Sequence, residues 1–355
     1  MKKTLGIFGV LVVVIGYASL REGEAFLSAY NLQNILQRAA LYGILGIGVS
    51  FVIMSGGIDL SIGSVVGLVG CIAPLVLTRL LKENMAEGVA IAMTLLACLA
   101  ATALIGLGHG LLITKMRLQP FVVTLCGLLV YRGVAQYIAA DRTLGSSGFG
   151  DLHYIANGKV PLPFVEGFQV PVPFFLLLGL GVVAAIFLNW TIYGRYMLAV
   201  GRNEQAARFS GISTERIIIS SYVLCAVIAG GLGGILFLLF QKSIQPDNHG
   251  NFYEVYAIAA AVLGGCSLRG GEGSILGVIL GAALIQVLYN ASNVLGFPTT
   301  LEFATIGSVI LAGAIVDEVV KRIAAARRRR KADVESGSQA ASRPHDDHVY
   351  RQTQQ

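Results

Sequence analysis

Charged residues are scarce in this 355-residue chain: Asp, Glu, Lys and Arg together make up only 13% of it, where soluble domains average about 25%. Hydrophobic residues reach 55%, which is more apolar surface than a soluble fold of this length can bury. Long apolar runs recur along the chain, and about 20 apolar residues cross the hydrocarbon core of a bilayer as a helix. The composition excludes an ordinary soluble domain and predicts a polytopic membrane protein.

Cysteine and histidine are also few, with five residues of each. The cysteines lie singly, mostly inside apolar runs, and no spacing is typical of a disulfide framework or a metal site. The histidines show no metal-ligand spacing. The chain lacks a Gly-x-x-x-x-Gly-Lys-[Ser/Thr] phosphate loop and a Gly-x-Ser-x-Gly nucleophile elbow. We therefore expect no catalytic residue, no metal site and no cofactor on this chain.

Ionisable residues are almost absent from the apolar runs, whereas proton- and sodium-driven carriers need them there. The exceptions are Asp59, at a helix break, and Arg132, with Glu254, Glu302 and Asp317 near predicted helix ends. This scarcity favours an energy source on a partner protein. A stand-alone facilitator or ion-coupled carrier of a small polar solute remains the alternative. An intramembrane enzyme would need clustered catalytic side chains, and the runs contain none.

The apolar runs predict an all-α fold with about ten transmembrane helices. The predicted spans are 4–20, 39–55, 61–81, 88–113, 121–140, 171–191, 217–239, 254–265, 274–290 and 303–320. The run 254–265 is too short to cross alone, so it either extends or forms a half-helix among its neighbours. The first run is similar to a signal peptide but lacks a convincing cleavage site, and we expect an uncleaved helix.

Basic residues in the connections set the predicted orientation. They lie in three segments that ten spans place on the same side as the N-terminus: Lys115 and Arg117; Arg195, Arg202, Arg208 and Arg216; and the tail from Lys321. Both termini are therefore predicted to be cytoplasmic. We expect a transmembrane permease domain at 1–320, with a cytoplasmic loop at 193–216, and a basic, disordered tail at 321–355.

The basic tail carries nine Lys or Arg residues against four acids, so it holds +5 of the net charge of +6. A run such as Arg327–Lys331 can bind nucleic acid or anionic lipid. Its position soon after an apolar span favours the lipid bilayer, and we expect no nucleic-acid partner.

The predicted outer segments are 21–38, 141–170 and 240–252. The second is rich in Gly, Ser and Pro, which interrupt helices and are typical of an ordered surface loop. At about 30 residues, such a loop is long enough to receive another protein.

Two glycine pairs interrupt apolar runs in similar contexts. The segment 55–64, which begins Ser55-Gly56-Gly57, is similar to 263–268 followed by Gly273-Ser274. Internal repeats are common in transporters. A similarity this short also fits chance, so both interpretations stay open.

Four segments, taken together, resemble the ribose/xylose/galactoside-type permease subunits of bacterial ABC sugar importers. They are 52–64, 110–133, 201–212 and 253–277, and the Gly-Gly-Ile-Asp-Leu-Ser core at 56–61 is the most specific. The resemblance covers roughly residues 30–320, in order and with fitting spacing. The chain departs from the family pattern at His109, Arg202, Tyr256 and Cys266, where Asn, Gly, Asp and Thr are usual.

The resemblance implies a multi-pass protein of the bacterial inner (cytoplasmic) membrane that forms the pathway for a sugar. Such a subunit works with an ABC ATPase subunit, an extracytoplasmic sugar-binding protein, and a second permease copy or a paralogue. ATP and magnesium would bind the partner ATPase. The outer segments 141–170 and 240–252 would then receive the binding protein.

The loop 193–216 contains a predicted short helix. Alanines and the Glu204–Arg208 pair, four residues apart, favour a helix, and Gly211 is a natural stop. The resemblance implies that this helix couples the spans to the ATPase; an ordinary basic connection is the alternative. The expected coupling residues are Gly201, Asn203, Glu204, Ala206, Ala207, Arg208 and Gly211.

The break motif includes Gly56, Gly57, Asp59 and Ser61. The Asp59 carboxylate can accept N–H groups at the start of the next helix, or it can contact solute.

An uncharged sugar needs hydrogen-bonding and aromatic groups along its route. The candidates are Gln286, Tyr289, Asn290 and Asn293, with Gln241; each can equally mark the membrane interface.

Overall fold

The computed structural model describes residues 2–162 and 167–296, together with Pro298, Leu301, Ala304, Gly307, Ser308, Leu311 and Ile315. The elements below belong to one unit, Met1–Ile306. In the second unit, Gly307–Gln355, the four described residues have helical backbone.

Within the described residues, eight helices are long and apolar enough to cross a membrane. They are α1 (Lys2–Phe26), α2 (Ala29–Met54), α3 (Ile62–Lys82), α4 (Glu87–Lys115), α5 (Pro120–Ala139), α7 (Val172–Trp190), the continuous run Thr214–Gln241 and α13 (Ile275–Val294). The run Thr214–Gln241 comprises α10 (Thr214–Cys225), a π-helical segment η2 (Ala226–Gly233) and α11 (Gly234–Gln241).

These eight helices coincide with eight of the predicted spans. The predicted run 254–265 is α12 (Tyr253–Leu263), an 11-residue helix that is too short to cross a bilayer about 30 Å thick. The predicted span 303–320 falls largely, and the tail 321–355 entirely, outside the described residues. The count of ten spans, the domain boundary at 320 and the side of the two termini therefore stay predictions.

The prediction of an outer loop at 21–38 is wrong. Helix α1 is kinked at Glu22 but remains helical to Phe26, and α2 begins at Ala29 with Ser28 as its N-cap. Polar residues of the first turns of α2 are satisfied by other elements: Gln33 accepts from Lys159, and Gln37 donates to the carbonyl of Ala156. A helix can contain polar side chains when other elements supply their hydrogen-bond partners. The polar composition of this segment was therefore a misleading sign of a loop.

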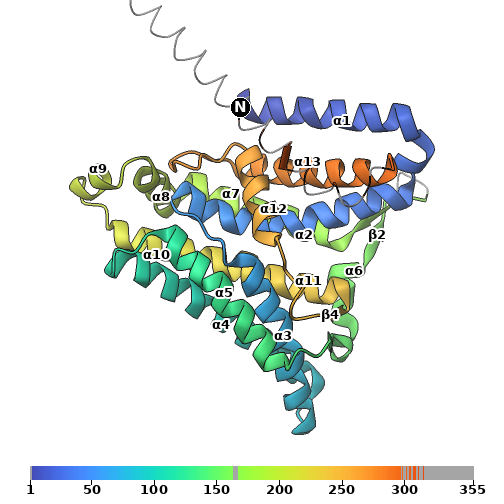
Figure 1. Cartoon of the computed structure of the whole chain (residues 1–355), viewed down its shortest axis with the longest axis horizontal. Helices are drawn as coiled ribbons and strands as arrows, with labels where there is room; N and C mark the ends of the chain where they lie inside the picture. Colours follow the sequence, from blue (N-terminus) through green and yellow to red (C-terminus); the bar gives the residue numbers. More distant parts are fainter. Residues whose placement is uncertain are drawn as a thin grey trace, which may run out of the picture. The chain divides into compact units, whose positions relative to one another are not determined.

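Helix α2 lies at the centre of the fold, packed by α7, α10, α12, α13 and η2 (Figure 1). The glycine cluster at 230–234 allows η2 to approach its neighbours closely, since a Cβ at Gly230 would lie 2.5 Å from Val65 Cγ1. Close approach through small residues is the usual packing mode of helices in lipid. Helix α1 is peripheral and packs mainly on α13.

The segment 141–170 is ordered in its described part, as predicted. It contains β1 (Leu144–Gly145), the 3₁₀ helix η1 (Ser147–Leu152), α6 (His153–Asn157) and β2 (Lys159–Pro161). Strand β1 pairs antiparallel with β4 (Ser243–Ile244), and β2 pairs with β3 (Gln169–Pro171). These short ribbons are additions to a helical fold.

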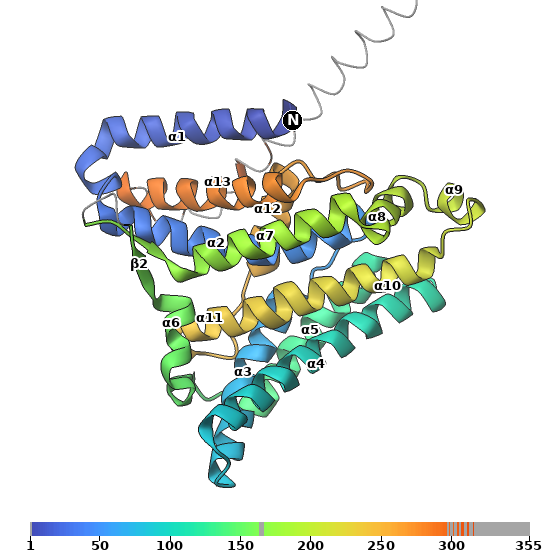
Figure 2. The same cartoon turned by 180° about the vertical axis from the view of Figure 1, so that it is seen from behind.

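Different elements surround the two ends of the helix run Thr214–Gln241. Helices α8 (Ile192–Arg202) and α9 (Glu204–Phe209) lie at its first end and α6 lies at its last end in both views (Figures 1 and 2). Strand β4 also contacts α11 at this last end (Figure 1).

Candidate functional site

The predicted short helix in the loop 193–216 is present as α9, preceded by α8. The side chain of Thr191 accepts from Gly194 N at 3.2 Å and caps α8. Asn203, between the two helices, accepts from Ala206 N at 2.9 Å and caps α9. Each cap satisfies a backbone N–H that a helix start leaves unpaired. The connection between α7 and α10 therefore consists mainly of two short capped helices, although its polar composition is typical of an irregular loop.

Glu204 and Arg208 form the expected pair, with Oε1 and Nη2 3.0 Å apart. Thr214, the first residue of α10, lies 3.3 Å from each partner through its Oγ1. The pair is partly exposed, so it contributes only about 0.3–0.5 kcal/mol by itself. Its position matters more, because it ties α9 to the start of a transmembrane helix.

Phe209 ends α9 and is 91% exposed. The backbone then turns at Gly211, whose φ of +82° favours glycine, while Ile212 N donates to Ala207 O at 3.1 Å. A large aromatic residue standing free on a short helix is typical of a protein–protein contact. The sequence reasoning did not single out Phe209, although an aromatic residue in a polar, basic loop was a usable signal.

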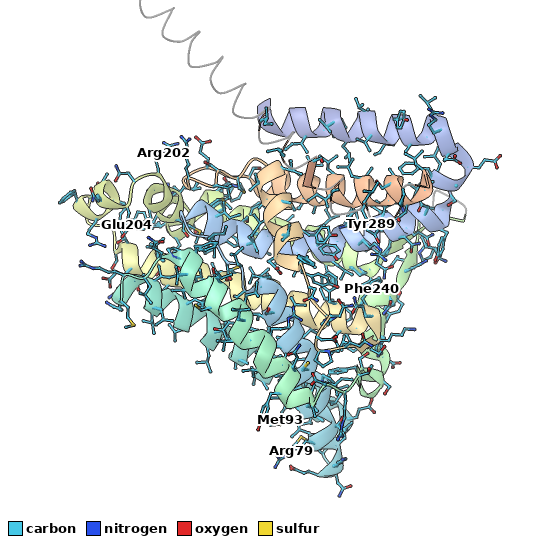
Figure 3. The ribbon with its side chains drawn as sticks, viewed as in Figure 1. Arg79, Met93, Arg202, Glu204, Phe240 and Tyr289 are labelled. Atoms are coloured by element: carbon cyan, nitrogen blue, oxygen red, sulfur yellow. The ribbon has the colours of Figure 1, made fainter. Side chains whose placement is uncertain are left out.

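Gly201, near the end of α8, lies where three backbone segments meet. A Cβ at Gly201 would lie 2.0 Å from Met54 O and 2.6 Å from Gly271 N, so a side chain does not fit without a shift. The same two backbone groups bond to each other, Gly271 N donating to Met54 O at 2.9 Å. The end of α8 is thus in backbone contact with the break after α2 and with the 264–274 connection. Arg202 comes next in the chain, and Glu204 begins α9 two residues later (Figure 3).

The two glycine pairs end their helices in the same way. At the end of α2, Gly56 has φ +89°, and Gly57 N donates to Val52 O at 2.9 Å. At the end of α12, Gly265 has φ +92°, and Cys266 N donates to Ala261 O at 2.9 Å. This left-handed glycine cap satisfies the last carbonyls of a helix. The left-handed residue is the first glycine of the first pair and the second glycine of the other, so the two caps are offset by one residue from the sequence similarity. Each break precedes a long helix.

Asp59 lies just before α3 and is only 1% exposed. Its Oδ1 accepts from both Ser61 N, at 2.9 Å, and Ser61 Oγ, at 2.7 Å. Ser61 is the N-cap of α3 and makes no cap bond with its own side chain. The carboxylate thus organises the turn into α3, the geometry expected for a structural role.

The second oxygen of Asp59 faces His109 of α4. Asp59 Oδ2 and His109 Nδ1 are 4.0 Å apart, which is too long for a hydrogen bond. Within the described residues, neither atom has a hydrogen-bond partner. His109 Nε2 lies 3.0 Å from the Tyr131 hydroxyl, and Tyr222 donates to the Ile58 carbonyl. A buried carboxylate beside a histidine resembles a proton site.

The four pathway candidates lie in the C-terminal half of α13. The 201–211 segment instead contacts the connection before the start of this helix, at Gly271. Asn290 exchanges hydrogen bonds with Asn31 at 2.6 and 2.9 Å, and Tyr289 lies 5.5 Å below the Arg38 guanidinium. Gln286 is buried, whereas Asn293 donates to Tyr289 O. The observed contacts join α13 to α2. Within the described residues, no group of three or more His, Cys, Asp or Glu side chains is placed to hold a metal ion.

Comparisons with known proteins find transport permeases. The family model described as branched-chain amino acid transport system / permease component matches residues 31–316. The ribose import permease of Escherichia coli K12 is 35% identical over 320 residues, covering 89% of this chain and 93% of the relative. The fructose import permease of Rhizobium meliloti is 31% identical, covering 85% and 82%.

The xylose transport system permease of Escherichia coli K12 is 28% identical over 89% of this chain and 91% of its own length. No solved structure gives a significant match. The matched region contains the Gly-Gly breaks, Asp59 and the whole of α8 and α9. The chain therefore belongs to the branched-chain amino acid transport system / permease component family, and within it to the ribose- and xylose-type permeases of bacterial ABC sugar importers.

Proposed function

We propose that this chain is the membrane-spanning subunit of an ATP-driven importer and forms the pathway for a sugar. It lies in the bacterial inner membrane as a multi-pass protein. An ABC ATPase subunit supplies the energy, an extracytoplasmic binding protein delivers the sugar, and a second permease copy or a paralogue completes the pathway. ATP and magnesium bind the ATPase and not this chain.

The observation that carries this proposal is the similarity to the ribose import permease of Escherichia coli, which extends over nine-tenths of both chains. The family description names branched-chain amino acids, but the relatives that match over most of this chain are named for ribose, fructose and xylose. A sugar is therefore the preferred substrate class.

The geometry of α9 supports its role as the contact to the ATPase. Phe209 is exposed at the end of this helix, and the Glu204–Arg208 pair bonds to Thr214 of α10. Gly201 then touches the backbone at Met54 and Gly271. Packed backbone segments transmit a displacement because they cannot deform independently. A movement of α9 would reach α2, α10 and the connection before α13 together.

A second candidate function, an ion-coupled carrier that works alone, is favoured by one observation. Asp59 and His109 are both buried and face each other across 4.0 Å, and such residues inside a membrane protein often relay protons. Family membership and the cap that Asp59 provides for Ser61 favour the ATP-driven importer instead.

The test is to express the chain with an ABC ATPase subunit and a sugar-binding protein from the same genome, and to purify the complex through a tag on this chain. We expect the ATPase to copurify and its hydrolysis rate to rise with the sugar-loaded binding protein. Phe209→Ala should reduce copurification, while Asn189→Ala, which truncates an exposed residue of α7, should not. A chain that purifies alone and lowers the pH gradient when it transports sugar would support the second candidate.

A further inference from the structure

A polar cavity of about 440 Å³ lies at the end of α11, opposite the end that bears α8 and α9. It opens to the surface, and we name it the polar cavity. Its lining consists of Thr143, Gln241, Ser243, Ile244, Gln245, Asn248, His249, Asn251 and Tyr253. Strands β1 and β4 join its two walls, with Gly145 opposite Ser243 and Ser146 N donating to Lys242 O at 2.8 Å. Its volume falls in the range of about 300–1,000 Å³ that is usual for small-molecule sites.

The wall of the polar cavity offers hydrogen bonds without formal charge. Thr143 and Ser243 contribute hydroxyl groups, and Gln245, Asn248 and Asn251 contribute amides. Amides and hydroxyls both donate and accept, as the hydroxyl groups of a neutral ligand require. Since none of these side chains is charged, the wall has no group that would pair with an ionised carboxylate or ammonium.

The floor of the polar cavity is a fixed chain of three side chains. Gln241 Nε2 donates to the Tyr253 hydroxyl at 3.0 Å, and Gln241 Oε1 lies 2.7 Å from His249 Nδ1. Because an amide oxygen only accepts, His249 Nδ1 must carry the ring proton. Burial, and to a lesser degree the Arg132 cation, lowers the pKa of His249 to about 3. The imidazole is therefore neutral at physiological pH.

The connection that forms this floor is held against α3 and α5. Arg132 of α5 donates to the carbonyls of both His249 and Pro246. On α3, a Cβ at Gly63 would lie 2.3 Å from Gly250 O, and one at Gly67 would lie 2.9 Å from His249 O. The loop backbone thus lies directly on the helix. A site fixed before the ligand arrives loses less ordering entropy on binding.

Tyr253 gives the polar cavity an aromatic group in a fixed position. Its ring packs 4.5 Å from Phe237 and 5.3 Å from Tyr42, centroid to centroid. A branched aliphatic side chain would need an apolar pocket, whereas Ile244 is the one aliphatic residue of this lining. Amides, hydroxyls and one aromatic ring, all uncharged, fit a neutral polyhydroxylated ligand best.

We propose that the polar cavity is a sugar-binding subsite on the permease itself, which holds the sugar between its release from the binding protein and its entry into the membrane pathway. The proposal rests on the proposed function for its substrate class. It places a step of sugar recognition on this chain through Gln241, Gln245, Asn248 and Tyr253. None of the pathway candidates on α13 lines this cavity.

The test is saturation-transfer-difference NMR on the full chain in lipid nanodiscs, with D-ribose, D-xylose, D-fructose and L-leucine as separate probes. We expect at least one sugar, and not L-leucine, to receive saturation from the protein. The double variant Gln245→Ala/Asn248→Ala should weaken that sugar's affinity about tenfold, since two hydrogen-bonding groups are removed. Both side chains are exposed, so the variant should fold, which its elution profile checks. Asn189→Ala, a matched loss of an exposed amide, should leave the affinity unchanged.

Absence of a signal from all three sugars would overturn the proposal, as would a sugar signal that the double variant does not weaken. If L-leucine receives saturation and the double variant abolishes it, the cavity binds amino acids and not sugars, and the proposal is wrong. Uptake by the assembled transporter separates the two proposals. If the complex imports sugar but the chain shows no sugar contact, the subsite is wrong and the proposed function stands. If the chain binds sugar at these residues but the complex imports none, the proposed function fails.

Discussion

Gly271 donates its backbone N–H to the carbonyl of Met54 at 2.9 Å, and Gly201 lies against both groups. This bond joins the break after α2 to the connection that follows α12. The end of α8 rests on it, immediately before the exposed helix α9. A displacement of α9 therefore has a direct backbone route into two parts of the bundle.

A side chain at position 201 should disturb this contact. In Gly201→Val, the Cβ would lie 2.0 Å from Met54 O, and relief of such overpacking costs roughly 1–3 kcal/mol. We expect a lower melting temperature and a loss of sugar-stimulated ATP hydrolysis in the assembled complex. Gly179→Ala is the control, because a Cβ there meets no atom within 4 Å. Equal melting temperatures and equal ATPase stimulation in the two variants would contradict the contact.

Reversing one charge of the α9 pair should reduce coupling while leaving the fold intact. Glu204→Arg places two cations together beside Thr214, and we expect uptake to fall roughly fivefold or more. Stability should change little, since a partly exposed pair contributes only about 0.3–0.5 kcal/mol. Uptake and ATP hydrolysis are measured on the same vesicles. If the pair acts by positioning α9, the swap Glu204→Arg/Arg208→Glu recovers part of the uptake; no loss in the single variant would refute the assignment.

Two substitutions at Asp59 separate a structural role from a chemical one. In Asp59→Asn, the amide oxygen can still accept from Ser61 N and Ser61 Oγ, so we expect near-normal uptake. Asp59→Ala removes both bonds and should destabilise the protein by about 1–3 kcal/mol. Melting temperature and uptake are measured for each. Loss of uptake in a stable Asp59→Asn protein would show that the charge is required, in favour of an ion-coupled mechanism.

The stability of the protein should depend on pH through His249. Its folded-state pKa is lowered to about 3, against an unfolded value of about 6.5. Above pH 6.5 both states are neutral at this residue. As the pH falls below 6.5, the unfolded state gains a proton that the folded state does not, so stability decreases by about 2 kcal/mol between pH 7 and pH 5.

His249→Gln removes the titrating ring but keeps a group able to donate to Gln241, so its stability should fall less over this pH interval. Arg132 of α5 is the charged group that acts on the ring, and Glu254 and Asp247 act on Arg132 in turn; all three are unchanged in the variant. Thermal unfolding of both proteins at pH 7 and pH 5 supplies the measurement. Identical decreases would show that His249 is not the titrating group.

The membrane-spanning helices and α9 were predictable because each depends on a local pattern. Apolar runs of about 20 residues predict spans, and Asn203, the Glu204–Arg208 pair and Gly211 mark the start, body and stop of one short helix. The break at Gly56 and the turn at Asp59 were likewise visible as a glycine pair followed by a carboxylate.

The polar cavity and the meeting point at Gly201 were not predictable from the sequence. Both depend on residues far apart in the chain: Thr143 with Gln241 in one case, and Met54 with Gly271 in the other. The start of α2 was missed for the same reason. Asn31 and Gln33 pair with Asn290 and Lys159, and no local pattern announces such partners.

The measurement that tests the account most directly is uphill sugar accumulation in vesicles that contain either this chain alone or the chain with its ATPase and binding protein. The account predicts accumulation only in the complete system with ATP, and its loss when the ATPase is omitted. Accumulation of sugar against a gradient by the chain alone would contradict it.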